Sequence, residues 1–79
     1  MRARVYVTRK QAVLDPQGKA IEHSLHALGF AEAQDVRLGK FIEFALEGSD
    51  TDRARQRVDE MCRALLANGV IEDYRFEIE

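Results

Sequence analysis

The feature that most constrains this chain is a strand-to-helix corner, Leu14-Asp15-Pro16-Gln17-Gly18. Before it, Ala3–Arg9 alternates apolar and polar residues, the period-2 pattern of a strand with one buried face. After it, apolar residues recur at helical spacing. Asp15 suits the N-cap position because its carboxylate accepts from free backbone N–H groups, and Pro16 suits the first helical turn, where no N–H is needed. The sequence therefore predicts a strand over Ala3–Arg9 and a helix over Pro16–Leu28.

Two more strands are predicted in the middle of the chain. The first runs from about Gln34 to Leu38, and Gly39-Lys40 then forms a tight hairpin turn, since glycine readily supplies a positive φ. The next strand covers 42–47, where apolar residues alternate with acidic or small ones. One face of this strand is therefore apolar and the other largely acidic.

A second helix over Thr51–Asn68 and a last strand over Ile71–Ile78 complete the predicted elements. Ser49 or Asp50 caps this helix, because both side chains accept from backbone N–H groups. The buried stripe of the helix is expected to consist of its apolar residues at helical spacing: Ala54, Val58, Met61, Cys62, Leu65 and Leu66.

The order β-α-β-β-α-β predicts an α+β fold, a two-layer ferredoxin-like sandwich. Right-handed crossovers place both helices on one face of a four-stranded antiparallel sheet. Arg and Glu on neighbouring strands of the opposite face can pair, each pair contributing roughly 0.2–1 kcal/mol. That face is either solvated or an interface, and it is expected to carry Arg4, Tyr6, Arg37, Glu43, Glu47, Arg75 and Glu77.

Length and charge exclude several classes of protein. We expect one domain over residues 1–79, and a domain this small buries only about 60% of its unfolded surface, which favours self-association. The net charge of −2 gives no electrostatic basis for binding nucleic acid or an anionic membrane. One cysteine forms no internal disulfide, and no apolar run suits a spanning helix or a signal peptide. A cytoplasmic protein is therefore expected.

No set of catalytic, cofactor-binding or metal-binding residues is predicted. Cys62 lies within an apolar stripe, where cysteine behaves as a small hydrophobe, whereas a catalytic thiol needs an accessible, electropositive setting. His23 and His26 lack further ligands on their helix face to complete a zinc site. Glu43 and Glu47 are about 13 Å apart along one strand, too far to act on a single bond.

Two binding functions remain as alternatives. The segment Gly39–Phe44 loosely resembles the aromatic RNA-binding strand of RRM domains, which have the same order of elements. Phe41 can stand on the open sheet face, but Phe44 points inward, and Glu43 and Glu47 repel phosphate. A regulatory module that binds a small molecule, as ACT-type domains of this topology do, is the other alternative, because the fold alone does not define a function.

Blocks along almost the whole chain resemble the PurS family, the small subunit of phosphoribosylformylglycinamidine (FGAM) synthase. Gly69 is a departure, because the family commonly has proline there. The matching blocks are Val13–Ala20, Leu28-Gly29-Phe30, Val36–Lys40 with Ile42-Glu43, Met61–Asn68 and Val70–Tyr74.

The resemblance implies an assembly role in a complex that makes FGAM from formylglycinamide ribonucleotide, ATP and glutamine. It implies two partners, the large subunit PurL, which holds ATP and Mg, and the glutaminase PurQ. It also implies a homodimer or homotetramer with no active site or cofactor on this chain, which joins the partners and aids ammonia transfer. The polar residues we expect at contacts between chains are Lys10, Gln17, Arg37, Lys40 and Glu72. For Gln17 and Lys40, local capping and hairpin support are equally good interpretations.

Overall fold

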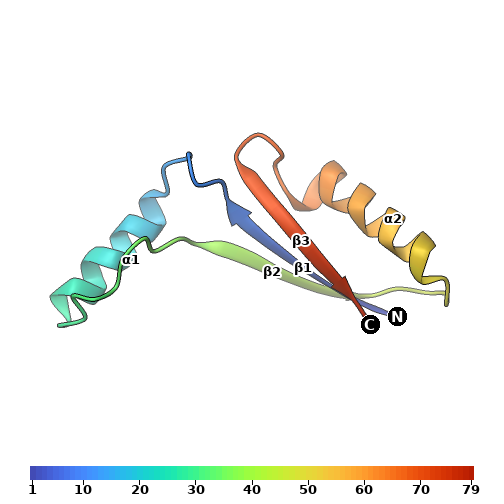
Figure 1. Ribbon diagram of the computed structural model, residues 1–79, viewed down its shortest axis with the longest axis horizontal. Helices are drawn as coiled ribbons and strands as arrows, with labels where there is room; N and C mark the ends of the chain where they lie inside the picture. The colour runs from blue at the N-terminus through green and yellow to red at the C-terminus, as the bar shows by residue number, and fades with distance from the viewer.

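The computed structural model describes residues 1–79 and contains a three-stranded antiparallel sheet with two helices (Figure 1). The elements are β1 (Arg2–Arg9), α1 (Pro16–Ala27), β2 (Gly39–Ala45), α2 (Thr51–Met61), a π-helical turn η1 (Cys62–Leu66) and β3 (Glu72–Ile78). The strand order is β2-β1-β3. In Figure 1, α2 lies along the sheet, whereas α1 extends beyond one end of it. None of the helices has both the length and the apolar character needed to cross a membrane.

The core is small and is centred on β1. Ala3, Val5 and Val7 on one face of this strand are buried against Val58 of α2 and Cys62 of η1. The alternation predicted for the three observed strands is therefore confirmed. Partly buried side chains surround this core: Ile42, Phe44, Leu46, Leu66, Tyr74, Phe76 and Ile78.

The predicted strand over Gln34–Leu38 is wrong, and the sheet has three strands instead of four. The backbone N–H groups of this segment bond to side chains near α1 instead of to a neighbouring strand. The Val36 N–H donates to Glu22 at 3.2 Å, and the Leu38 N–H donates to the Asp15 carboxylate at 2.8 Å. The segment therefore anchors α1 and does not extend the sheet.

The hairpin turn predicted at Gly39-Lys40 is also wrong. Both residues belong to β2, where Gly39 pairs with Thr8 and Lys40 with Val7 of β1. Without a preceding strand there is nothing for a hairpin to connect. Glycine is needed at position 39 for another reason, because a Cβ atom there would lie 2.5 Å from the Val7 carbonyl oxygen.

The prediction that both helices cover one sheet face is correct only for α2. α1 has no extensive contact with any strand or with the other helix, and Gly18 is its only buried residue. With 34–38 outside the sheet, no crossover brings α1 back over the strands. The molecule is consequently elongated: its radius of gyration is 15.9 Å, against about 12 Å expected for a compact chain of this length.

The second helix changes character near its end. α2 ends at Met61, and η1 continues as a π-helix to Leu66, close to the predicted end at Asn68. A π-helix places more residues in each turn than an α-helix, which rotates the side chains that follow. Leu65, expected in the buried stripe, is 83% exposed for this reason.

The termini lie together at the end of the sheet away from α1 (Figure 1). The Arg2 N–H donates to the Glu79 carbonyl at 3.0 Å, and the Glu79 N–H donates back to Arg2 at 2.9 Å. The two ends of the chain are thus held together by a reciprocal pair of backbone hydrogen bonds.

The corner at Asp15 is confirmed and does more than cap a helix. One carboxylate oxygen of Asp15 accepts from the Gly18 N–H at 3.0 Å, and the other accepts from the Leu38 N–H at 2.8 Å. These two bonds, that to Leu38 first, hold the pKa of the Asp15 carboxyl below its ordinary value despite its burial. Asp15 therefore joins the start of α1 to the start of β2.

Close packing at the same corner explains why residue 18 is a glycine. A Cβ atom at this position would lie 2.2 Å from the Val36 carbonyl oxygen, which is much closer than any real contact. The backbone of α1 can approach the segment before β2 only because residue 18 has no side chain.

We expect Gly18→Ala to lower the free energy of unfolding by about 1–3 kcal/mol, because the new methyl group must displace backbone at the corner. Urea denaturation at a fixed protein concentration measures the change. The matched control is Gly69→Ala, where an added Cβ meets nothing within 4 Å, so its effect should stay below about 0.5 kcal/mol. Equal stability of the two variants would contradict the close approach.

We expect Asp15→Asn to lower the urea midpoint near neutral pH. Because the folded-state pKa of Asp15 lies below the unfolded value of about 3.9, its contribution is complete above about pH 4 and disappears as the pH falls through the folded-state pKa. The difference in midpoint between variant and parent should therefore shrink on acidification. Glu47→Gln, which alters an exposed carboxylate without a hydrogen bond, is the control and should show no such trend.

Candidate functional site

The cysteine and histidine side chains, which could be chemically reactive, do not lie together in one site. Cys62 is fully buried, and burial raises the pKa of its thiol, which disfavours the nucleophilic thiolate. His23 and His26 are exposed on α1, and His26 Nε2 lies 2.7 Å from the Ala33 carbonyl oxygen. No group of three or more His, Cys, Asp or Glu residues has a geometry that could hold a metal ion.

The five predicted contact residues gather at one end of the sheet, where β1 ends and α1, β2 and β3 begin. We call this region the polar junction. It surrounds a hollow of about 230 Å³ that is lined by three of the predicted residues. Arg9, which the sequence analysis did not single out, lines the same hollow; its position as the last residue of β1 is the signal that identifies it. The polar junction consists of Arg9, Lys10, Gln17, Arg37, Lys40 and Glu72.

Arg37 is occupied within its own chain. Its guanidinium donates to the carbonyl oxygens of Val13 at 2.7 Å, Gln11 at 2.7 Å and Lys10 at 3.2 Å. Three donors on one planar group fix the loop between β1 and α1. Arg37 thus holds the loop that borders the polar junction, and it does not stand on the open sheet face, where it was predicted to lie.

Lys40 and Glu72 lie at the starts of β2 and β3. The Lys40 ammonium is 3.8 Å from the Glu72 carboxylate and 3.3 Å from the Leu66 carbonyl oxygen. Glu72 also accepts from the Asn68 N–H at 2.8 Å, which ties the end of η1 to β3. Lys40 remains largely exposed, whereas the Glu72 carboxylate is mostly buried, so Lys40 is the member of this pair that a partner can reach.

Gln17 and Lys10 complete the polar junction. Gln17 is exposed in the first turn of α1 and makes no hydrogen bond within the chain. The capping role suggested for Gln17 is filled by Asp15 instead. The Lys10 side chain is at 3.9 Å from Asp73, the limit of an ion pair, and contributes little in that geometry.

Charged side chains on the open face of the sheet form ion pairs with one another. Glu43 receives hydrogen bonds from Arg2 at 2.9 Å and from Arg4 at 3.0 Å, which lower its pKa to about 2. Arg4 also pairs with Glu79. The predicted pairing of Arg and Glu across neighbouring strands is therefore confirmed, and Arg4 and Glu43 are direct register partners.

The aromatic residues of this face are also engaged. Tyr6 packs against Phe41 with ring centroids 5.1 Å apart, and the Arg75 guanidinium lies 3.9 Å from the centre of the Tyr6 ring. Phe41 does stand on the open face, as the sequence suggested. The Tyr6 ring is covered, however, so it does not offer a free platform on which a base could stack.

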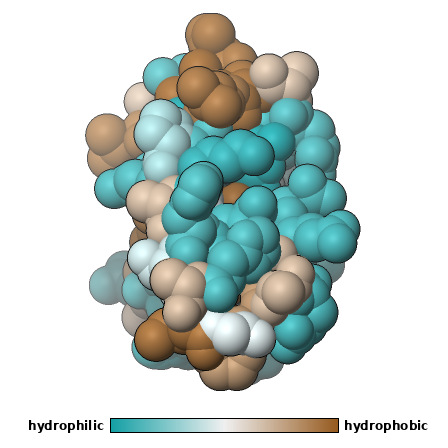
Figure 2. Space-filling view, turned by 90° about the vertical axis from the view of Figure 1, so that its left-hand side faces the viewer, coloured by the Kyte–Doolittle hydropathy of each residue, from teal (hydrophilic) through white to brown (hydrophobic).

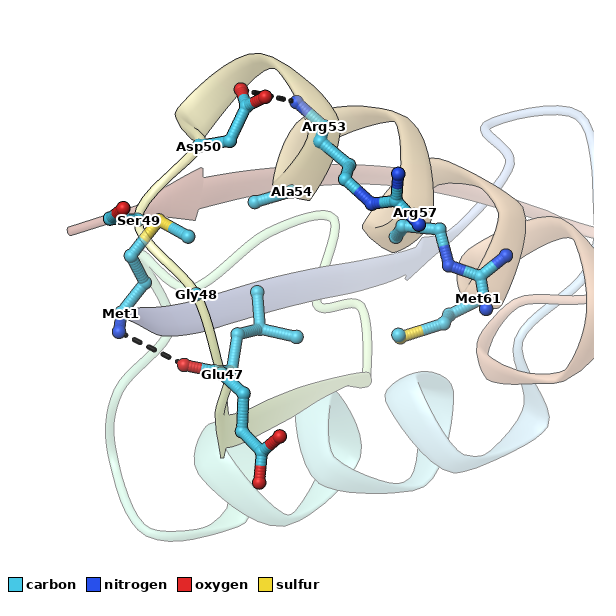
Figure 3. Close-up of a pocket in the computed structure, with 10 residues that line it drawn as sticks. Met1, Glu47, Gly48, Ser49, Asp50, Arg53, Ala54, Arg57 and Met61 are labelled. Carbon is cyan, nitrogen blue, oxygen red and sulfur yellow. Dashed lines mark hydrogen bonds between the residues drawn. The ribbon is translucent and has the colours of Figure 1, made fainter.

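The largest hollow, of about 590 Å³, lies between the end of β2 and α2 (Figure 3). Figure 3 shows the Asp50 carboxylate accepting from the backbone of Arg53 at the start of α2, with Arg57 further along the helix. The Arg57 guanidinium pairs with Glu60 at 2.8 Å. Acidic and basic groups are both present in this hollow.

A neighbouring groove is entirely apolar. It has a volume of about 380 Å³, and all of its lining side chains are hydrophobic. We call it the β2 groove, because it lies beside β2 on the sheet face that α2 partly covers. Its residues are Phe44, Met61, Ala64, Leu65 and Leu66. Leu65 was predicted to lie in the core, and it is exposed because the π-helical turn changes the direction of its side chain.

Large apolar side chains are exposed elsewhere as well. The surface area of the chain is 5841 Å², against about 4,850 Å² expected for a compact protein of 9.0 kDa. Figure 2, which faces the end of the molecule where α1 lies, shows hydrophobic atoms gathered at its top and bottom with a hydrophilic band between them. The exposed apolar residues are Leu14, Ile21, Leu28, Phe30, Leu38, Phe41, Leu65 and Val70.

Comparisons with known proteins point to one family. The family model PurS, described as phosphoribosylformylglycinamidine (FGAM) synthase, matches residues 2–79. The FGAM synthase subunit PurS of Bacillus subtilis is 54% identical over 99% of this chain and 92% of its own length. The PurS subunit of Methanocaldococcus jannaschii is 38% identical over 99% of this chain and 94% of its own length.

Solved structures give the same result. The B. subtilis PurS structure superposes with a TM-score of 0.88 and covers 99% of this chain and 96% of that one, at 54% identity. A chain in the structure of PurLQS from Thermotoga maritima superposes with a TM-score of 0.88 over 96% of this chain and 93% of that one, at 30% identity. The likeness extends over sequence, fold and length together, and this chain therefore belongs to the PurS family.

Proposed function

We propose that this chain is the small, non-catalytic assembly subunit of an FGAM synthase, joining a large synthetase subunit PurL to a glutaminase PurQ. The complex converts formylglycinamide ribonucleotide, ATP and glutamine to FGAM in purine biosynthesis. The observation that carries the proposal is the 54% identity to the B. subtilis PurS subunit over 99% of the chain. The match to a chain of the T. maritima PurLQS structure supports PurL and PurQ as the partners.

The physical character of the chain supports an assembly role. Its one thiol is buried, while its surface exceeds that of a compact protein of this mass by about 1,000 Å². Several large apolar side chains are exposed on this surface, which is typical of a protein that works in contact with others. A homodimer or homotetramer that also contacts the two larger subunits, in the cytoplasm, is the arrangement we propose.

The polar junction is the surface we assign to the larger partners. Gln17 offers an unpaired amide, and Lys40 an exposed ammonium held by one long ion pair. Arg37 keeps the adjoining loop rigid, which lowers the entropic cost of docking. Lys10 and Glu72 border the same surface. ATP and Mg are assigned to PurL, and release of ammonia from glutamine to PurQ; this chain aids ammonia transfer by holding the two together.

Co-purification of the chain with its cognate PurL and PurQ, with and without glutamine and ADP, tests the proposed function. We expect a stable ternary complex whose glutamine-dependent activity requires this chain, while activity with free ammonia needs PurL alone. Full glutamine-dependent activity of PurL and PurQ without the chain would overturn the assembly role. Turnover of any of these substrates by the isolated chain would overturn its non-catalytic nature.

We expect Lys40→Glu to reduce glutamine-dependent activity about tenfold or more while sparing activity with free ammonia, because reversing a charge at an interface weakens docking. Steady-state rates of the reconstituted complex with each nitrogen source measure the effect. Arg55→Glu, which reverses an exposed charge on α2 outside the polar junction, is the matched control and should leave both rates unchanged. Equal loss of both activities in Lys40→Glu would count against a docking role for Lys40.

A further inference from the structure

Charged residues interrupt the apolar face of the sheet at the end where α1 begins. Alternate residues of a strand share a face, so Arg9 follows Val5 and Val7 on the inner face of β1. Lys40 of β2 is the register partner of Val7 and therefore shares this face. Glu72 of β3 is the register partner of Arg9 and shares it too. All three strands thus place a charged residue where their alternation would place an apolar one.

These side chains line the hollow of about 230 Å³ in the polar junction, together with Gln17, Leu38 and Gly39. Arg9 forms no ion pair within the chain, and its guanidinium makes one hydrogen bond, to the Leu14 carbonyl oxygen at 3.3 Å. A guanidinium carries several N–H donors, and the Arg9 side chain is partly buried, away from the water that would satisfy them. Arg9 therefore lacks the partner that a partly buried cation needs.

The one carboxylate that lines the hollow is already engaged. Glu72 accepts from the Asn68 N–H at 2.8 Å and lies 3.8 Å from the Lys40 ammonium. Two cations against one carboxylate leave a single positive charge unbalanced, and the unpaired Gln17 amide adds a further donor at the rim. A carboxylate matches this arrangement, because it carries one negative charge and its oxygens fit the paired donors of Arg9. A doubly charged phosphate would be repelled by Glu72.

Apolar side chains around the hollow indicate that the carboxylate belongs to a protein. Leu38 lines the hollow and is 42% exposed, and Leu14, whose carbonyl oxygen accepts from Arg9, is 69% exposed. Val70, in the turn directly before Glu72, is 81% exposed. A small dissolved carboxylate would leave these side chains in water, whereas a protein surface that carries an Asp or Glu covers them at the same time.

We infer that the hollow of the polar junction binds the carboxylate of an Asp or Glu side chain on one of the larger subunits. Arg9 donates a pair of N–H···O bonds to this carboxylate, and Lys40 supplies a second positive charge. Leu14 and Leu38 pack against the surface around it. Arg9 is therefore a specificity-determining residue of the interface. This inference rests on the proposed function and names the chemical group that the polar junction recognises.

Zero-length cross-linking of the reconstituted complex tests which group enters the hollow. A carbodiimide couples a lysine amine directly to a neighbouring carboxylate, so Lys40 should form an amide with an Asp or Glu of PurL or PurQ, identified by mass spectrometry. Lys40 also lies beside Glu72, and the isolated chain measures that background. Mixing ¹⁵N-labelled and unlabelled chains separates links within one copy from links between copies. Absence of any link from Lys40 to a larger subunit would overturn the inference.

Removal of the guanidinium tests its contribution to binding. We expect Arg9→Met to raise the dissociation constant of the chain for immobilised PurL and PurQ about tenfold or more, as measured by biolayer interferometry. Arg9→Lys keeps the charge without the paired donors and should recover part of the affinity. Because Arg9 makes one long hydrogen bond within the chain, the circular dichroism spectrum should be unchanged. Arg55→Met, on an exposed part of α2, is the matched control and should change the constant less than about twofold.

The outcomes separate this inference from the proposed function. Equal binding of Arg9→Met and the unsubstituted chain would overturn the inference and leave the assembly role supported, whereas absence of any complex with the unsubstituted chain would overturn both. A saturable rise in the melting temperature of the isolated chain with glutamate, absent in Arg9→Met, would mean that a free carboxylate fills the hollow. Weaker self-association of Arg9→Met in analytical ultracentrifugation, with unchanged binding to PurL and PurQ, would assign the hollow to a second copy. Either result would overturn the inference.

Discussion

The two hydrogen bonds accepted by the Asp15 carboxylate determine the shape of the whole molecule. One comes from Gly18 at the start of α1 and the other from Leu38 just before β2. Together they close the corner between the first strand and the first helix, and they use a backbone donor that a fourth strand would have needed. Because this corner is fixed, α1 is directed away from the sheet, and the inner face of β2 stays partly uncovered.

This geometry separates two kinds of surface. The open sheet face is charged, and its Arg and Glu side chains pair with one another. Ile21 and Leu28 at α1 and the side chains of the β2 groove are apolar, and large parts of them are exposed. The polar junction lies between them and combines a rigid loop, held by Arg37, with the reachable groups of Gln17 and Lys40. The chain thus has separate apolar and polar surfaces that are open to contact.

The sequence predicted the elements whose pattern is local. Alternation along β1 identified Ala3, Val5 and Val7 as core residues, and the Asp15-Pro16 pair located the start of α1. It failed where a distant group decides the outcome. Residues 34–38 alternate like a strand, but Glu22 and Asp15 bond to their N–H groups. For the same reason the sequence did not show that Arg37, one of the predicted contact residues, is occupied by three carbonyl oxygens of its own loop.

The reciprocal hydrogen bonds between Arg2 and Glu79 place the two ends of the chain side by side, at the far end of the sheet from α1. A purification tag or fluorescent protein added to either terminus therefore emerges at the same corner, remote from the polar junction. A short linker can also join the old termini, and new ones can be opened at the exposed Gly69-Val70 turn. The chain can therefore be given new ends without changing how its strands and helices are arranged.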